Sequence, residues 1–243
     1  MNHPAPSPAL PPLRRTGRHR PPGTGALIAT VALAATLGVA GAPGGPGTPG
    51  AAIGVARAQE SQGPAARFVE RTVERLQGLL RRNVSGAAAE RRDAQVQETI
   101  GEIIDFQTIA EASLRRHWDD VDAGKRQEFV RLLRALVQRS YRKNLEETLD
   151  YRIRYESEQA RGDRRLVRTL AQNRRNRREP PVQVTYELRP EGNDWRIVDV
   201  DTDGVGMVSN YRSQFNRIIR EHDFDELLRR MRDRLKSDED GDL

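Results

Sequence analysis

Beyond the N-terminal quarter of the chain, hydrophobic side chains recur every three or four positions, which is the spacing of amphipathic helices. The pattern predicts a first helix over about 64–82 and a second that includes residues 96–104. A third helix is expected to begin at Asp105, and the strongest pattern predicts a long helix over about 122–149. Asp122 is a suitable N-cap for that helix, because its carboxylate can accept a hydrogen bond from a first-turn N–H.

Near Tyr151 the hydrophobic period changes from helical to two, as expected of a strand with one solvated face. Four successive segments show this pattern, and a Pro-Glu-Gly-Asn-Asp turn sequence at 190–194 separates the last two. The predicted strands span about 151–156, 165–172, 182–189 and 195–200. Because the connections between them are short, we expect an antiparallel meander.

After Gly204 the helical spacing returns, over about 208–219 and again over 224–235. The sequence therefore predicts an α+β fold in which an antiparallel four-stranded meander sheet has helices packed on one face. We expect one domain over residues 64–236, followed by an acidic, disordered tail at 237–243.

The N-terminal 58 residues have the features of an export signal followed by a linker. Four arginines precede an Ala-, Leu- and Val-rich run at 26–42, and Ala56-Arg57-Ala58 fits a small-x-small cleavage site. The run is too short and too rich in small residues for a typical membrane-spanning helix, although an uncleaved anchor is the alternative. We therefore predict a periplasmic protein that has no stable membrane insertion after cleavage.

Charge and composition narrow the function classes. The formal net charge is +6, but residues 1–58 hold five arginines and no acidic residue, which leaves 36 basic and 35 acidic residues beyond them. Such a balance does not favour nucleic-acid binding, which needs an uncompensated basic surface. The absence of cysteine excludes a disulfide scaffold, a thiol nucleophile and a Cys-based zinc site.

Motifs for catalysis or metal binding are weak in this sequence. Asp199, Asp201 and Asp203 copy the first half of a calcium-binding loop, but the twelfth position is Asn210, where the loop needs a glutamate. His117, beside Trp118, is a weak candidate for a general base. We predict no catalytic residue, no metal and no cofactor.

The densest basic cluster is Asn-Arg-Arg-Asn-Arg-Arg at 173–178, between two predicted strands. A solvated loop and an electrostatic docking surface for an acidic partner or an anionic lipid surface are both open. Nucleic acid is a poorer match, because no aromatic residues are interleaved with the arginines. The predicted docking residues are Arg174, Arg175, Arg177 and Arg178.

Several stretches together resemble the MlaC family, the periplasmic phospholipid-binding component of the maintenance-of-lipid-asymmetry pathway, also called the toluene-tolerance family. They are DFQTIAEASLRRHW (105–118), KRQEFVRLLRALVQRSY (125–141), VTYELRPEGNDWRIVDVDTDGVGMVSNYRSQF (184–215) and FDELLRRM (224–231). The sequence departs from the family at Gly206, where Ser is frequent, and at Arg115-Arg116, which replace a usual Gly. The resemblance covers roughly residues 64–236.

The resemblance implies a monomeric carrier without enzymatic activity that shuttles phospholipid between an outer-membrane lipoprotein–porin complex and an inner-membrane ABC transporter. Acyl chains would lie in an apolar cavity between the sheet and its helices. Tyr211 and Arg212 are expected near the headgroup, although helix packing explains them equally well. The other predicted lipid-facing residues are Phe106, Ile109, Phe129, Leu133, Leu136, Tyr141, Tyr151, Val184, Tyr186, Val198, Val200 and Met207.

Two other functions remain open at this point. One is a small-molecule enzyme on a cone-shaped α+β fold, with an aspartate in an apolar cavity as general base. The other is a binder of anionic surfaces or nucleic acid through the 173–178 loop, whose binding would depend strongly on salt. The sequence indicates neither the preferred lipid headgroup nor the direction of transport.

Overall fold

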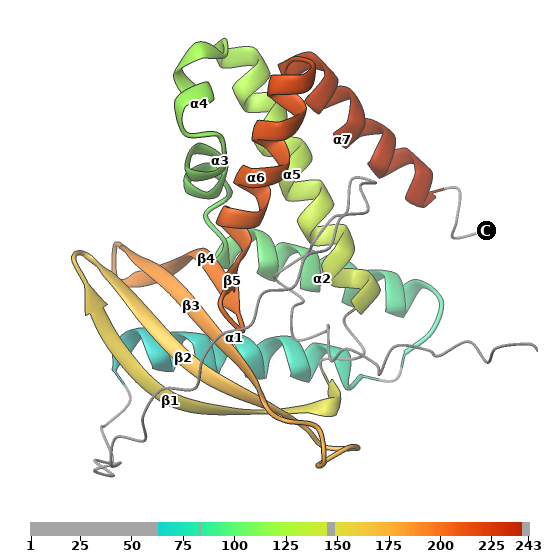
Figure 1. The fold of residues 1–243 in the computed structure, drawn as a ribbon. Helices are drawn as coiled ribbons and strands as arrows, with labels where there is room; N and C mark the ends of the chain where they lie inside the picture. The colour runs from blue at the N-terminus through green and yellow to red at the C-terminus, as the bar shows by residue number, and fades with distance from the viewer. Residues whose placement is uncertain (1–62, 83, 145–148, 240–243) are drawn as a thin grey trace, which may run out of the picture.

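The computed structural model describes residues 63–82, 84–144 and 149–239. The predicted export signal and linker, and the end of the acidic tail, lie outside these residues. Helices come first along the chain, then a sheet, then two further helices (Figure 1). The helices are α1 (Pro64–Leu80), α2 (Ala87–Ile103), α3 (Phe106–Leu114), α4 (Arg116–Asp120), α5 (Ala123–Asn144), α6 (Met207–Glu221) and α7 (Phe224–Glu239).

The sheet is an antiparallel meander in the order β1-β2-β3-β4-β5, as the short connections predicted. Its strands are β1 (Tyr151–Arg161), β2 (Arg164–Asn173), β3 (Val182–Glu191), β4 (Asp194–Thr202) and β5 (Val205–Gly206). The α+β fold is therefore confirmed, but the two-residue β5 brings the sheet to five strands instead of four. A two-residue strand is too short to leave a periodic signal in the sequence.

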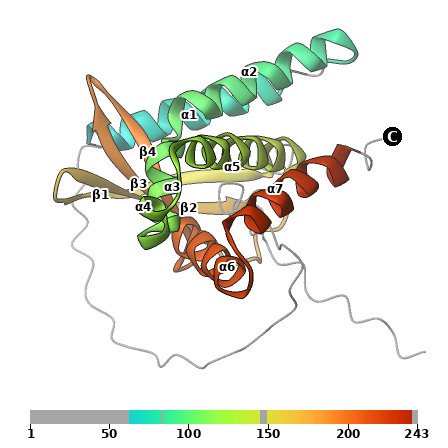
Figure 2. The same ribbon diagram turned by 90° about the horizontal axis from the view of Figure 1, so that it is seen from above.

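Helices lie against one face of the sheet and beyond one end of it. Helix α1 crosses the sheet and contacts β1, β2 and β4, while α3, α5, α6 and α7 form a helical layer (Figure 1). Seen from above, α5 lies between α2 and α7 (Figure 2). The described helices include none that is both long and apolar enough to cross a bilayer.

The inner face of the sheet is apolar and in register. Val167, Tyr186 and Val200 are aligned across β2, β3 and β4, and each is at most 9% exposed. A register shift at Glu187/Leu188 leaves Val198 as an extra residue of β4. Val198 is buried but lies outside the apolar cluster formed by the other buried side chains, because the bulge takes it off the regular alternation.

A second bulge, between Tyr155 and Ser157, turns Glu158 toward the inner face opposite Val167. There the Glu158 carboxylate accepts a 2.8 Å hydrogen bond from the Ala66 N–H in the first turn of α1. The N-cap residue Gly63 provides no side-chain cap, and a Cβ on it would lie 2.2 Å from Glu158 Oε2. The strand therefore supplies the cap that the helix lacks, and this contact fixes α1 to the sheet.

Several predicted element boundaries differ from those of the structure. Helix α5 ends at Asn144, before the predicted 149, and Leu149–Asp150 form a 3₁₀ turn. Strand β3 continues through Pro190, so that the hairpin turn consists of Gly192 and Asn193, with Gly192 at φ +59°. Proline is tolerated there because the pairing of β3 with β2 has already stopped at Leu188.

Asp105 begins α3, as predicted, and also joins it to the sheet. Its carboxylate accepts hydrogen bonds from the Thr108 N–H (2.9 Å) and the Thr108 hydroxyl (2.6 Å). The Arg189 guanidinium of β3 donates to the same carboxylate, and the Asp105 N–H donates to the Ile197 carbonyl (2.9 Å). Burial by itself raises the pKa of Asp105, but the bonds from Thr108 and Arg189 outweigh it and hold the pKa below its usual value.

Replacing Asp105 with asparagine is expected to lower the free energy of unfolding by about 1–3 kcal/mol at neutral pH, because the charged hydrogen bonds to Arg189 are lost. The folded-state pKa lies below the unfolded value of about 3.9, so this stabilisation is present at neutral pH and disappears as the pH falls below about 4. Urea unfolding of both proteins at neutral and acidic pH measures this. Asp163→Asn, at an exposed turn, is the control. If the loss in free energy of unfolding caused by Asp105→Asn is as large in acid as at neutral pH, the stabilising role of the charged Asp105 is contradicted.

Candidate functional site

The hydrophobic side chains predicted to face the lipid are all buried, at 9% exposure or less. All of them except Val198 belong to one continuous apolar cluster between the sheet and the helices. Burial does not by itself distinguish a residue of a closed core from one that lines a cargo cavity. Contact of these side chains with lipid therefore stays a prediction.

The part of this set in the helical layer has identifiable packing partners. The Phe129 ring lies 5.3 Å from the Phe215 ring in an edge-to-face arrangement and 5.8 Å from Phe224. Tyr211 stacks on Phe215 at 5.4 Å. The Arg212 guanidinium donates to the Ala112 carbonyl (2.8 and 3.1 Å) and so joins α6 to α3. Helix packing, the role that the sequence left open for Arg212, is present.

The part near the sheet contains three tyrosines, Tyr141 from α5, Tyr155 from β1 and Tyr186 from β3. Tyr141 and Tyr186 are more than nine-tenths buried, and Tyr155 is partly buried. Burial raises all three pKa values, that of Tyr186 to about 12, and the nearby Tyr186 also raises the pKa of the other two. The hydroxyls have no hydrogen-bond partner among the described residues. The interior therefore holds polar groups that can still donate a hydrogen bond.

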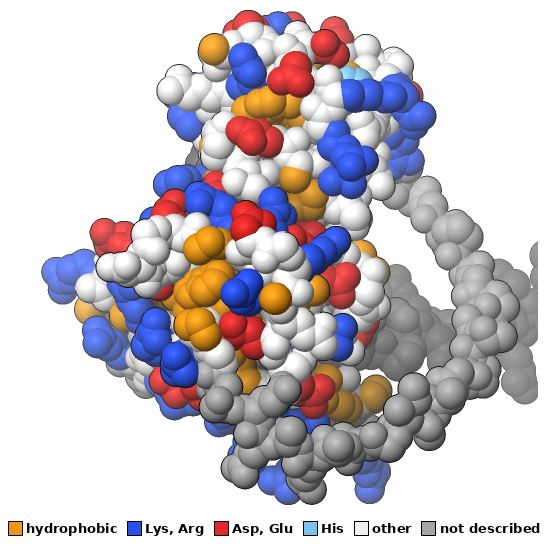
Figure 3. All heavy atoms as spheres, turned by 90° about the vertical axis from the view of Figure 1, so that its left-hand side faces the viewer, with side chains coloured by type: hydrophobic (Ala, Val, Ile, Leu, Met, Phe, Trp, Pro, Cys, Tyr) orange, Lys and Arg blue, Asp and Glu red, His pale blue; other side chains and the backbone are white. Residues whose placement is uncertain are grey.

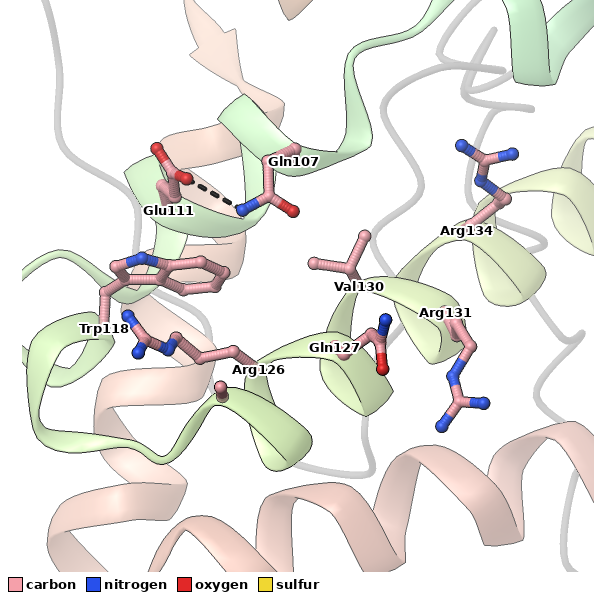
Figure 4. A pocket seen from close by; sticks show the side chains of 9 residues that line it. Gln107, Glu111, Trp118, Arg126, Gln127, Val130, Arg131 and Arg134 are labelled. Atoms are coloured by element: carbon pink, nitrogen blue, oxygen red, sulfur yellow. Dashed lines mark hydrogen bonds between the residues drawn. The ribbon is translucent and has the colours of Figure 1, made fainter.

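A hollow of about 560 Å³ lies in the helical layer, between α3, α4 and α5. Arg126 lies against the Trp118 ring at 5.5 Å, while Val130 points into the space between them and the rest of α5 (Figure 4). Gln107 donates to Glu111 at 2.8 Å on the opposite wall. Hydrophobic side chains reach the surface between charged ones on the side drawn in Figure 3. Sequence reasoning missed this site, because its residues come from three elements and share no motif.

Another hollow, of about 630 Å³, lies beside the 173–181 loop. Its lining includes two arginines of the predicted docking cluster, together with Arg152 of β1, which the sequence did not single out. The other lining residues are Gln172 and Asn173. Neither this hollow nor the one between α3 and α5 is lined by a residue of the predicted lipid-facing set.

The three aspartates near Gly204 each accept a hydrogen bond from a backbone N–H. Asp199 accepts from the Val208 N–H (3.0 Å) and so caps α6, Asp201 accepts from the Gly204 N–H, and Asp203 from the Gln183 N–H. Burial raises the pKa of Asp199, in part opposed by its backbone hydrogen bonds. The described residues contain no group of three or more His, Cys, Asp or Glu arranged to hold a metal ion.

The surroundings of Gly206 account for one departure from the family pattern, the glycine at a position where Ser is frequent. Gly206 is the N-cap of α6 and provides no side-chain hydrogen bond, so the Asp199 carboxylate supplies the cap from the neighbouring strand. A Cβ at Gly206 would lie 3.2 Å from Asp199 Oδ2. The glycine therefore leaves room for the carboxylate that replaces a capping side chain.

Comparison with known proteins agrees with this architecture. The model of the MlaC protein family matches residues 70–233. A solved structure of the phospholipid-binding protein from Ralstonia solanacearum in complex with a phospholipid has the same fold, with a TM-score of 0.58 and 19% sequence identity. The similarity covers 73% of this chain and 98% of that one. No curated protein matches the sequence. The family match extends over the helices, the sheet and the tyrosine-bearing interior alike, and the chain belongs to the MlaC family.

Proposed function

We propose that the protein is a periplasmic phospholipid carrier that shuttles lipid between an outer-membrane lipoprotein–porin complex and an inner-membrane ABC transporter, without a catalytic step. Membership of the MlaC family supports lipid binding, and the similar fold in Ralstonia solanacearum was solved with a phospholipid. The observation that carries the proposal is the apolar interior between the sheet and the helices, with three unpartnered tyrosine hydroxyls.

The tyrosines suit a cargo that is apolar along its chains and polar at one end. The Tyr141 and Tyr186 hydroxyls are not among the fully buried unpaired polar atoms of the described residues, which are Ser113 Oγ and Thr202 Oγ1, so they lie at the edge of the interior, where they can donate to an acceptor on the cargo. The ester and phosphate oxygens of a phospholipid are such acceptors, whereas its acyl chains match the surrounding valines and leucines. Helix α5, which carries Tyr141, packs on α2, α3 and α7, so the tyrosine reaches the sheet side from a separate layer.

Energetics require the cargo to pass directly between partners. At about 0.8 kcal/mol per buried CH₂, two acyl chains with about 30 methylenes would cost about 24 kcal/mol to expose to water. This exceeds the ceiling of about 18–21 kcal/mol for non-covalent affinity. Loading from free monomer is therefore negligible, and the carrier must dock at each membrane complex and then leave. Weak, partly electrostatic docking suits such a cycle.

The protein purified without detergent is expected to carry phospholipid. Native mass spectrometry should show a mass excess over the processed chain, and denaturation should release it as an extractable phospholipid that identifies the cargo. Where the native mass is that of the bare chain, incubation with labelled phospholipid vesicles supplies the cargo. Failure to take up lipid from these vesicles would contradict the carrier function and favour the enzyme alternative.

A further inference from the structure

The loop at 173–181 joins β2 to β3 at the end of the sheet opposite the β1–β2 and β3–β4 hairpin turns, and side-chain hydrogen bonds hold its shape (Figure 1). Asn173 Oδ1 accepts from the N–H groups of Arg175 (2.9 Å) and Asn176 (3.1 Å). The amides of Asn173 and Asn176 donate to the two carboxylate oxygens of Glu179, at 2.9 and 3.1 Å. Both oxygens of the acidic residue in the loop are therefore engaged by neutral amides, and its charge is not paired with an arginine.

The arginines of the loop divide into paired and unpaired groups. Arg175 forms an ion pair with Asp150 at 2.8 Å. Arg174 and Arg177 are exposed, and together with Arg152 they line the hollow of about 630 Å³, in which no acidic residue takes part. None of these three guanidiniums has an ion-pair partner among the described residues. Three positive charges thus face one space and repel each other unless an anion joins them.

This hollow lies on the outer face of the sheet. Arg152 pairs in register with Gln172, while its neighbours Tyr151 and Ile153 alternate to the inner face. The hollow is therefore separate from the predicted lipid-facing interior. Its lining contains guanidinium and amide groups and no hydrophobic side chain, so it cannot hold an acyl chain.

We propose that Arg152, Arg174 and Arg177 form a contact site for the phosphate headgroups of an anionic lipid bilayer. The inference rests on the proposed carrier function, because a lipid carrier must approach such a surface. Guanidinium forks match phosphate oxygens in bidentate geometry. Protein interfaces have a partly apolar centre, which the hollow between α3 and α5 offers through Trp118 and Val130 but this one lacks.

The contact is weak enough to be reversible. An arginine near an anionic membrane surface contributes about 1 kcal/mol, which is about fivefold in the partition coefficient. Removing all three charges should therefore weaken binding to anionic vesicles about 100-fold. Because the Debye length falls from about 10 Å at 0.1 M salt to about 3 Å at 1 M, high salt should release the wild-type protein too.

The test compares the triple variant Arg152→Gln/Arg174→Gln/Arg177→Gln with wild type in vesicle flotation. One set of vesicles is pure phosphatidylcholine and the other an equal mixture with phosphatidylglycerol. Arg71→Gln/Arg82→Gln/Arg91→Gln removes the same charge from exposed arginines elsewhere and is the matched control. We expect wild type and control to bind the anionic vesicles alike and the site variant to lose that binding.

Equal binding of the site variant and the control to anionic vesicles would overturn the proposal. Wild-type binding to neutral vesicles as strong as to anionic vesicles would also overturn it. A third contrary result is that the wild-type protein binds a polyglutamate peptide through the three arginines but does not bind anionic vesicles. The phospholipid that co-purifies with each protein is measured in parallel. If wild type retains cargo but does not bind anionic vesicles, the contact site alone is refuted. If wild type neither carries cargo nor takes up labelled phospholipid from vesicles, the carrier function is refuted.

Discussion

Phe129→Ala is expected to lower the free energy of unfolding by about 3–5 kcal/mol, the usual cost of removing a buried phenylalanine ring. Phe129 is fully buried on α5 and lies between Phe215 of α6 and Phe224 near the start of α7. Its removal deletes two aromatic contacts and leaves a cavity where three helices meet. Close-packed side chains relax only partially around a new cavity, so most of the lost packing free energy should appear as a lower free energy of unfolding.

Chemical denaturation followed by circular dichroism measures this loss, and Val205→Ala is the control. Val205 is 57% exposed, and its truncation should change the stability by no more than about 0.5 kcal/mol. The experiment also decides between two roles for Phe129, which the sequence placed among the lipid-facing residues. A loss below about 1 kcal/mol would show that Phe129 borders a space able to rearrange, and would contradict its assignment to the closed helical core.

The sheet shows how far periodicity alone predicts this fold. Alternation places Tyr186 and Val200 on the inner face, and the structure confirms both. The bulges are a different matter, because one extra residue reverses the alternation without a change in composition. Glu158 consequently faces inward to cap α1, and Val198 leaves the apolar cluster. Contacts of this kind depend on pairing between strands, which a single sequence does not encode in any local pattern.

At the candidate sites, too, the composition of the sequence indicates a feature but does not predict its geometry. The density of arginines at 173–178 identifies a basic loop but not which guanidiniums face one space. Asp150 forms an ion pair with Arg175, whereas Arg152 of β1 lines the same hollow as Arg174 and Arg177. Apolar spacing on α5 identifies a buried stripe but does not separate core from cavity lining. Only substitution experiments make that separation, because both kinds of position require the same side chains.

Leu136→Arg is the substitution with the largest expected effect on cargo, the complete loss of co-purified phospholipid while the protein stays folded. Leu136 lies on α5, is 9% exposed and belongs to the apolar cluster, and Tyr141 lies five residues further along the same helix. If it lines the cargo space, the guanidinium finds room and water once the lipid is absent, so the fold survives. A charge facing acyl chains costs several kcal/mol without a partner, which is enough to exclude them.

Extractable phospholipid and circular dichroism are measured on the same preparation, with Gln127→Arg as the control. Gln127 is exposed on the same helix and lines the hollow between α3 and α5, so an arginine there should affect neither lipid nor fold. An unfolded Leu136→Arg protein would assign Leu136 to the closed core, in contradiction to the prediction. Retained lipid in a folded Leu136→Arg protein would move the cargo elsewhere in the interior, with the tyrosines of β1 and β3 as the next positions to substitute.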